Sequence, residues 1–174
     1  MPNHVINEII FRNVDVAKQN EMLVMIRNGL GEVDFEILVP IPINVWRGSV
    51  GEKHEKAFRQ NALDWARLNW GTKWNAYEQK PIERTDDTLI LRFKTAWGPP
   101  YGWLCAIFNF FKLPFEHNWL SEGHDRGVCG KFNWSRMDDL GGEPWNEEPA
   151  DEAMHRHLHK LLWCVEEFSD EDAA

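Results

Sequence analysis

Asn69-Trp70-Gly71-Thr72-Lys73-Trp74-Asn75 is the stretch around which this sequence is organised, and a second stretch follows it at Phe93-Lys94-Thr95-Ala96-Trp97-Gly98-Pro99-Pro100. Gly71 suits the end of a helix, because glycine enters the left-handed region of backbone conformations without a steric penalty. Pro99 and Pro100 end the alternating pattern before them, because proline cannot donate a hydrogen bond to a neighbouring strand. The two stretches therefore predict a corner at which a helix and a strand both end.

We name this predicted corner the tryptophan corner, and its candidate binding residues are Trp70, Gly71, Thr72, Lys73, Trp74, Asn75, Thr95 and Trp97. The favoured interpretation is structural and makes the three indoles core residues, because buried aromatic side chains dominate core energetics. The alternative is a surface for a ligand or a partner. Lys73 is expected to stack on a neighbouring indole, and its alternative role is to hold an anion at the helix end.

The same two stretches resemble the signature of the YubB-type family of plasmid and phage proteins. The pattern Trp-Gly-Thr-Lys-Trp-Asn and then Phe-x-Thr-Ala-Trp-x-Pro-Pro carries the resemblance, together with the glycine in Val128-Cys129-Gly130. It extends over about residues 3–135. The resemblance implies a ferredoxin-like domain and a setting on mobile genetic elements, and it implies no particular reaction.

Hydrophobic periodicity predicts the order of the helices and strands. Strands are expected at 4–12, 33–39, 74–83, 88–95, 115–120 and 128–134, and helices at 16–29, 54–69, 101–112 and 149–168. Asp15 is the expected N-cap of the first helix, and Leu23, Ile26 and Leu30 form its expected inner face. Without an insertion at about 43–72, the order is β-α-β followed by β-α-β, which can fold as two split βαβ units.

Pattern and resemblance together predict an α+β fold. It is a ferredoxin-like antiparallel sheet with helices packed on one face, a helical insertion and an extra C-terminal helix. The ferredoxin-like domain is expected at 1–135, and an acidic linker with the terminal helix, packed on the same domain, at 136–174.

The charge balance restricts the classes of partner. The formal net charge is −9, which opposes direct nucleic-acid binding, since that is driven by cationic groups displacing counterions from phosphates. The same charge opposes an anionic membrane surface and favours a basic partner. Three well-separated cysteines and no apolar run of about 20 residues favour a cytoplasmic protein without a membrane span.

The acidic segment before the terminal helix is the second candidate binding site, and its residues are Asp138, Asp139, Glu143, Trp145, Glu147 and Glu148. Its carboxylates can imitate the phosphate spacing of nucleic acid, and its indole can supply a desolvated anchor. The alternative is a solvated linker whose charge maintains solubility.

Few groups of residues in the sequence could bind a metal or carry out catalysis. His155 and His159 are four residues apart on the terminal helix and share one face, which is the spacing of a metal site. We favour a solvated helix flank, with no metal and no cofactor. Cys129 near His117 or His124 is interpreted as an apolar strand residue, and no phosphate-binding loop, nucleophile elbow, zinc-protease motif or dinucleotide fingerprint is present.

We therefore expect a non-enzymatic, acidic interaction protein of a phage or mobile element. Its expected partner is a basic host protein that it inhibits, such as a nucleic-acid-handling effector, which makes an anti-CRISPR or anti-restriction protein the concrete form. One alternative is a metal-dependent or hydrolytic enzyme using the histidines of the terminal helix. Another is an RNA-binding ferredoxin-like module, which the charge and the missing aromatic signature oppose.

Overall fold

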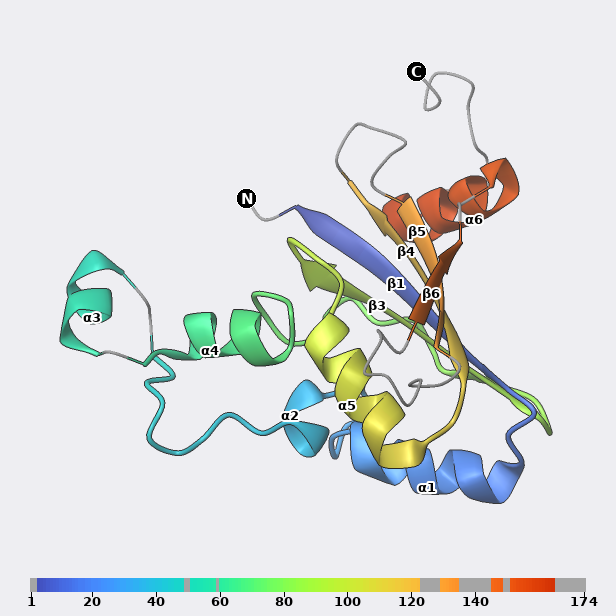
Figure 1. Ribbon diagram of the computed structural model, residues 1–174, viewed down its shortest axis with the longest axis horizontal. Helices are drawn as coiled ribbons and strands as arrows, with labels where there is room; N and C mark the ends of the chain where they lie inside the picture. Colours follow the sequence, from blue (N-terminus) through green and yellow to red (C-terminus); the bar gives the residue numbers. More distant parts are fainter. Residues whose placement is uncertain are drawn as a thin grey trace.

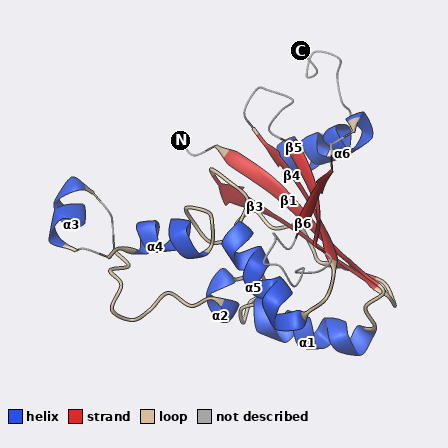
Figure 2. Ribbon diagram, viewed as in Figure 1, coloured by secondary structure: helices blue, strands red, loops and turns tan. Residues whose placement is uncertain are grey.

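A computed structural model describes residues 3–48, 51–58, 60–122, 129–134, 145–148 and 151–164. It contains a twisted antiparallel sheet, with one group of helices on one face and a single helix on the other (Figure 1). Figure 2 separates the strands from the helices by colour. The predicted α+β, ferredoxin-like class is confirmed.

The sheet has six strands in the order β2-β3-β1-β4-β5-β6. Their bounds are β1 His4–Arg12, β2 Glu83–Arg84, β3 Thr88–Ala96, β4 Phe115–Ser121, β5 Cys129–Trp134 and β6 Trp145–Glu148. All neighbouring strands are antiparallel, and β1 lies between β3 and β4. The predicted strands at 4–12, 88–95 and 115–120, and the pairing of the last with the strand that follows, are confirmed.

The helices are α1 Val16–Ile26, α2 Phe35–Leu38, α3 Glu52–Ala57, α4 Ala62–Asn69, α5 Tyr101–Phe111 and α6 Glu152–Trp163. Asp15 caps α1 as predicted, because its carboxylate accepts the Lys18 N–H at 2.8 Å. Leu30 lies beyond the end of α1 and is exposed, so its predicted place on the inner face is wrong.

Alternating residues of β1 serve two separate apolar clusters. Ile9 and Phe11 face the large core built with α1, α2 and α5. Ile6 points to the opposite face, where Leu158 and Leu162 of α6 pack on it. The terminal helix therefore covers the sheet face that α1 and α5 leave open (Figure 1).

The predicted strand at 33–39 is wrong, because this segment forms α2. Asp34 accepts the Glu36 N–H at 2.9 Å and so caps the short helix. Phe35 is fully buried, with its ring centroid 4.5 Å from that of Trp103. The predicted strand at 74–83 is also wrong over most of its length. This segment forms an isolated bridge between Tyr77 and Lys94, and then the two-residue strand β2, which pairs with β3 at the edge of the sheet.

The insertion is helical as predicted, but its single helix at 54–69 is wrong. The chain forms α3 and α4 separately, because Asn61 caps a new helix by accepting the Asp64 N–H at 2.9 Å. Phe58 stacks on Trp46 at 4.5 Å between ring centroids and belongs to neither helix. Figure 1 shows this inserted segment as an arm that extends from the rest of the protein, with α3 projecting away from the sheet at its end. We name the inserted segment the arm.

The region from 136 onward is only partly described. Residues 145–148, predicted as part of an irregular linker, form β6 and pair with β5. The terminal helix begins after Asp151, whose carboxylate accepts the Met154 N–H at 2.7 Å. Asp138, Asp139 and Glu143 lie outside the described residues.

Candidate functional site

The tryptophan corner has a buried side, where α4 ends against the start of α5. Gly71 has a left-handed φ of 87°, and a Cβ at this position would lie 2.9 Å from the backbone nitrogen of Tyr101. A Cβ on Gly102 would lie 2.2 Å from the carbonyl oxygen of Asn69. The predicted glycine stop is therefore confirmed, and two glycines allow the two helix ends to meet backbone to backbone.

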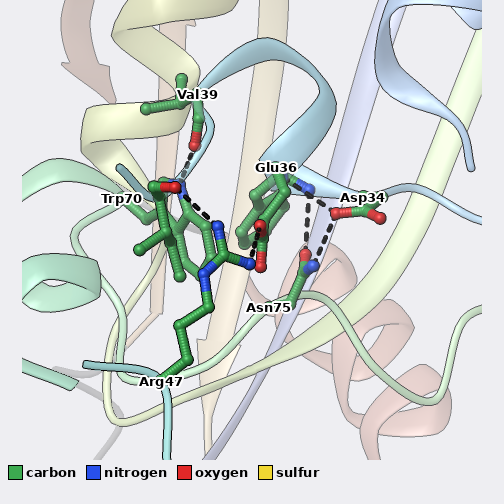
Figure 3. Close-up of polar contacts among 8 residues, drawn as sticks. Asp34, Glu36, Val39, Arg47, Trp70 and Asn75 are labelled. Atoms are coloured by element: carbon green, nitrogen blue, oxygen red, sulfur yellow. Dashed lines mark hydrogen bonds and ion pairs between the residues drawn. The ribbon is translucent and has the colours of Figure 1, made fainter. Parts of the chain in front are cut away.

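Trp70 and Asn75 fasten the corner to α2 (Figure 3). Trp70 is 3% exposed, and its Nε1 donates to the carbonyl oxygen of Val39 at 2.9 Å. The Asn75 amide oxygen accepts the Phe35 N–H at 2.9 Å, and its amide nitrogen donates to Asp34 Oδ1 at 2.7 Å. For these two residues the structural interpretation holds.

Arg47 extends this fastening to the start of the arm (Figure 3). Its guanidinium donates to Glu36 Oε2 at 2.8 Å and to the carbonyl oxygen of Ile41 at 2.6 Å. A bonded guanidinium between two chain segments restricts both, because its fork geometry fixes each partner. The segment from α2 to the arm is thus held in place by polar contacts.

The two threonines of the corner are also internal. Thr72 is buried, and its hydroxyl donates to the carbonyl oxygen of Ala96 at 2.8 Å. Thr95 is buried, and its hydroxyl donates to the carbonyl oxygen of Gly98 at 2.8 Å. Both threonines stabilise the turn that leaves β3, and neither is presented to a partner.

Trp74 and Trp97 lie on the outer side of the corner, so the prediction that they are core residues is wrong. Trp74 is 43% exposed and Trp97 is 54% exposed. Trp97 follows the last residue of β3 with a left-handed φ of 75°, and its N–H donates to the carbonyl oxygen of Asn3 at 2.8 Å. Such a conformation is strained for a bulky residue, and strain of this kind is concentrated at functional sites.

Two cations lie over these exposed indoles. The Lys73 ammonium is 4.9 Å from the ring centroid of Trp74 and 4.5 Å from that of Trp97. The Arg67 guanidinium carbon is 4.9 Å from the Trp97 centroid. The predicted cation–π contact of Lys73 is confirmed, and Arg67 was missed. We name the four residues Arg67, Lys73, Trp74 and Trp97 the basic–aromatic surface.

Tyr77 packs against this surface at Trp74, and the sequence analysis did not identify it as a residue of the site. Its ring packs edge-on against Trp74 at 6.2 Å, and its hydroxyl donates to the carbonyl oxygen of Thr95 at 3.1 Å. Burial raises the pKa of Tyr77 to about 12, so the hydroxyl stays protonated and keeps this hydrogen bond. Its spacing of three residues from Trp74 is the signal that was available in the sequence.

His155 and His159 lie on one face of α6, as the sequence predicts, and His157 has a different partner. The His155 and His159 rings are 6.3 Å apart, and the described part of the chain holds no group of three His, Cys, Asp or Glu side chains suited to a metal. His157 instead contacts the buried Glu8, with 2.8 Å between Nε2 and Oε2. Burial opposes ionisation of Glu8, but hydrogen bonds from His157 and Arg92 outweigh it and lower its pKa.

Of the acidic candidates, Trp145, Glu147 and Glu148 lie in β6, opposite Trp134, Phe132 and Lys131 of β5. Half of the predicted acidic segment is therefore an edge strand of the sheet rather than a linker.

None of the helices in the described ranges has the length and apolar character needed to cross a membrane.

Comparison with known proteins gives one match. A family model described as a ferredoxin-like domain in Api92-like protein matches residues 69–156, about half of the chain. No curated protein and no solved structure matches. The matched residues include the tryptophan corner, α5 and strands β2 to β6. The family description agrees with the antiparallel sheet and its helical layer, and the chain belongs to this family of ferredoxin-like domains in Api92-like proteins.

Proposed function

We propose that this protein is a non-enzymatic binding protein that anchors a partner protein on its basic–aromatic surface. The observation that carries the proposal is Trp97, a half-exposed indole held in a left-handed backbone conformation beside a second exposed indole. Tryptophan and arginine are the residue types most enriched among binding hot spots. Since the fold tolerates strain at this position, the exposed ring is a feature that the surrounding structure maintains.

The proposed partner is a basic host protein, and the setting is a phage or another mobile element. The net charge of −9 supports this, because long-range attraction follows the overall charge of the two proteins. The cations of the corner are engaged within the protein, because Lys73 and Arg67 lie over the indole rings and Arg67 also pairs with Asp64. The indoles therefore provide the desolvated anchor, and the overall charge attracts the partner. A nucleic-acid-handling effector of a host defence system fits this description, which makes counter-defence, against CRISPR or restriction, the concrete biological role we propose.

Single substitutions on the outer side of the corner test the proposal. The partner is first captured from a bacterial host lysate on the immobilised protein, and its affinity is then measured with Trp74→Ala and Trp97→Ala. Each variant should weaken binding about 10- to 30-fold, which corresponds to a loss of about 1.4–2 kcal/mol at a hot spot. The matched control is Trp163→Ala on α6, since Trp163 is 50% exposed and lies outside the corner.

Two results would contradict the proposal. If Trp163→Ala weakens binding as much as the corner variants, the indoles act through general hydrophobicity and not through this site. If none of the three variants changes the affinity, the corner is not the docking surface. The basic nature of the partner is tested separately, because attraction between oppositely charged proteins must weaken as salt increases.

Single-stranded nucleic acid is a second candidate ligand, and one observation favours it. Exposed indoles next to Lys73 and Arg67 resemble the stacking platforms of proteins that bind single strands. The net charge of −9 opposes it. Titration with a short polyuridine oligonucleotide, followed by tryptophan fluorescence, distinguishes the two candidates, because stacked bases quench the exposed indoles.

The enzymatic alternative rests on α6, where the contact between His157 and the carboxylate of Glu8 gives an oriented imidazole. Hydrolytic activity that disappears in His157→Gln would favour this alternative over a binding protein.

A further inference from the structure

A hollow of about 410 Å³ lies between α1 and the edge strand β2, and its lining includes no residue of the basic–aromatic surface. It is lined by Asn20, Leu23, Val24, Arg27, Asn28 and Arg84. Four of these six side chains are polar, and none is a carboxylate. The absence of a lining acid is notable in a chain with 28 acidic and 19 basic residues.

The two arginines of the hollow differ from the other arginines of the described chain. Arg12, Arg47, Arg67, Arg92 and Arg156 each form an ion pair with a carboxylate. Arg27 and Arg84 form no such pair with any described residue. Two guanidinium charges that have no carboxylate partner in the described part of the chain thus line the same hollow.

Hydrogen bonds hold Arg84 in place through neutral partners. Its Nε donates to Gln19 Oε1 at 2.9 Å, and one of its terminal nitrogens donates to Asn20 Oδ1 at 2.8 Å. Gln19 is itself fixed, since its amide nitrogen donates to the carbonyl oxygens of Val14 and Thr85. These hydrogen bonds fix the position of the Arg84 side chain, and its positive charge remains available to a ligand.

The amide oxygens of the two asparagines in the hollow already accept hydrogen bonds from the protein. The amide oxygen of Asn20 accepts from Arg84, and that of Asn28 accepts the N–H groups of Leu30 and Glu32 at 2.9 and 3.1 Å. The side-chain amide N–H groups of Asn20 and Asn28 remain as hydrogen-bond donors. Arg27 adds to this set, because its Nε is buried and finds no acceptor among the described residues. The side chains of the hollow therefore offer hydrogen-bond donors and positive charge.

We propose that this hollow binds a phosphate monoester. A dianion matches the two guanidinium charges, neither of which pairs with a carboxylate among the residues that the structure describes, whereas a single carboxylate neutralises only one of them. Guanidinium forks and amide N–H groups also suit the several oxygens of a phosphate. Leu23 and Val24 provide an apolar wall for the organic part of the ligand. This site is independent of the corner and of the partner proposed above.

The test is an NMR titration of the full-length, ¹⁵N-labelled protein at constant ionic strength. Inorganic phosphate, glycerol 3-phosphate and acetate are added in turn, and the Nε–H signals of Arg27 and Arg84 are followed. Both phosphates should cause saturable shifts of these signals, and acetate should not. Arg27→Gln and Arg84→Gln should each weaken phosphate binding about 10- to 100-fold, the usual effect of losing a charged hydrogen-bond partner.

The matched control is Arg156→Gln, which removes the same charge from the surface of α6 and should leave the affinity unchanged. Equal weakening in this control would overturn the proposal, because binding would then depend only on net charge. Saturation by acetate at the same concentration, or the absence of any saturable shift, would also overturn it. Should Arg27→Gln fail to fold, Arg84→Gln carries the test, since Arg84 has an exposed side chain.

Discussion

His117 donates a hydrogen bond to Asn7 in the interior of the protein, with 3.1 Å between Nε2 and the amide oxygen. The direction follows from Asn7, whose amide nitrogen is already used as a donor to the Thr95 hydroxyl at 2.9 Å. Thr95 then donates to the carbonyl oxygen of Gly98, next to Trp97. A buried chain of hydrogen bonds thus runs from β4 through β1 and β3 to the turn that presents the exposed indole.

The first prediction concerns pH. Complete burial lowers the pKa of His117 to about 3, so the folded protein keeps this imidazole neutral while the unfolded chain protonates it near its ordinary pKa of about 6.5. Acid therefore favours the unfolded chain. The free energy of unfolding should fall by about 1.4 kcal/mol for each pH unit below about 6.5. Urea unfolding curves recorded from pH 7 to pH 5 measure this slope.

The control for this slope is His117→Gln, which keeps a donor for Asn7 and removes the titration. The slope should become nearly flat in this variant and remain in His155→Gln, which changes a histidine outside the core. Carboxylates with lowered pKa values, such as Glu8, lose their stabilising contribution only at lower pH. An unchanged slope in His117→Gln would show that another group governs the pH dependence.

The second prediction separates two tryptophans of the corner, Trp70 and Trp74, by their effect on stability. Trp70→Ala should lower the free energy of unfolding by about 3–5 kcal/mol, because it empties a buried site and leaves the Val39 carbonyl without its donor. Trp74→Ala should cost less than about 1.5 kcal/mol, since this residue is 43% exposed. Thermal and urea unfolding of both variants provide the comparison, and equal losses would show that the exposed ring is also structural.

The third prediction concerns the left-handed backbone at Trp97. Trp97→Gly should be more stable than Trp97→Ala by about 1 kcal/mol, because alanine retains the steric cost of this conformation and glycine does not. At an ordinary backbone position the order is the reverse. Urea unfolding of the two variants measures the difference, and a more stable alanine variant would show that the turn carries no strain.

The fourth prediction tests the fastening at Asn75. Asn75→Ala should cost about 1–3 kcal/mol, because the buried end of α2 loses its acceptor for the Phe35 N–H. Asn75→Asp should not restore stability, since its carboxylate would lie beside that of Asp34, which now accepts from the Asn75 amide at 2.7 Å. Recovery of full stability in Asn75→Asp at pH 7 would mean that the contact with Asp34 contributes nothing.

The fifth prediction uses a pair of glycines. Gly102→Ala should destabilise the protein by about 1–3 kcal/mol, because the new methyl group would lie 2.2 Å from the Asn69 carbonyl oxygen. The effect opposes helix propensity, which favours alanine over glycine inside α5. Gly29→Ala is the matched control, since nothing lies within 4 Å of its added Cβ. Equal effects in the two variants would show that the α4 and α5 ends can separate without loss.

The parts of the fold that sequence could predict are those in which local pattern and tertiary position agree. The strand 88–95 alternates apolar and polar residues, and the helix 101–112 is a long apolar segment that begins after two prolines. Asp15 has a local capping role that needs no distant partner. The segment 33–39 has an equally clear strand period but forms α2. Its two buried residues, Val33 and Phe35, are placed by distant partners, Gln79 and Asn75, which take up their backbone N–H groups.

The outer side of the corner was not predictable for a related reason. The three tryptophans of the two paired stretches look alike in sequence, and only the left-handed turn after β3 separates the exposed Trp97 from the buried Trp70. No glycine marks that turn at Trp97 itself. The donor-lined hollow was equally hidden, because Arg27 and Arg84 are brought together by the packing of α1 against the sheet edge.

The central position of β1 sets the order in which this protein can be assembled. β1 pairs with β3 on one side, with His4 opposite Ala96, and with β4 on the other side, with Ile10 opposite Glu116. Both edges of β1 therefore pair with segments that are synthesised much later. On the ribosome, the N-terminal strand must remain unpaired until β3 has emerged, and its second edge stays open until β4 follows. Unpaired strand edges of this kind can pair with other chains. A fragment of residues 69–156 would contain β3 and β4 without the strand that joins them. Adding a peptide of residues 1–30 to a fragment of residues 31–174 should then rebuild the sheet, as in a split reporter protein.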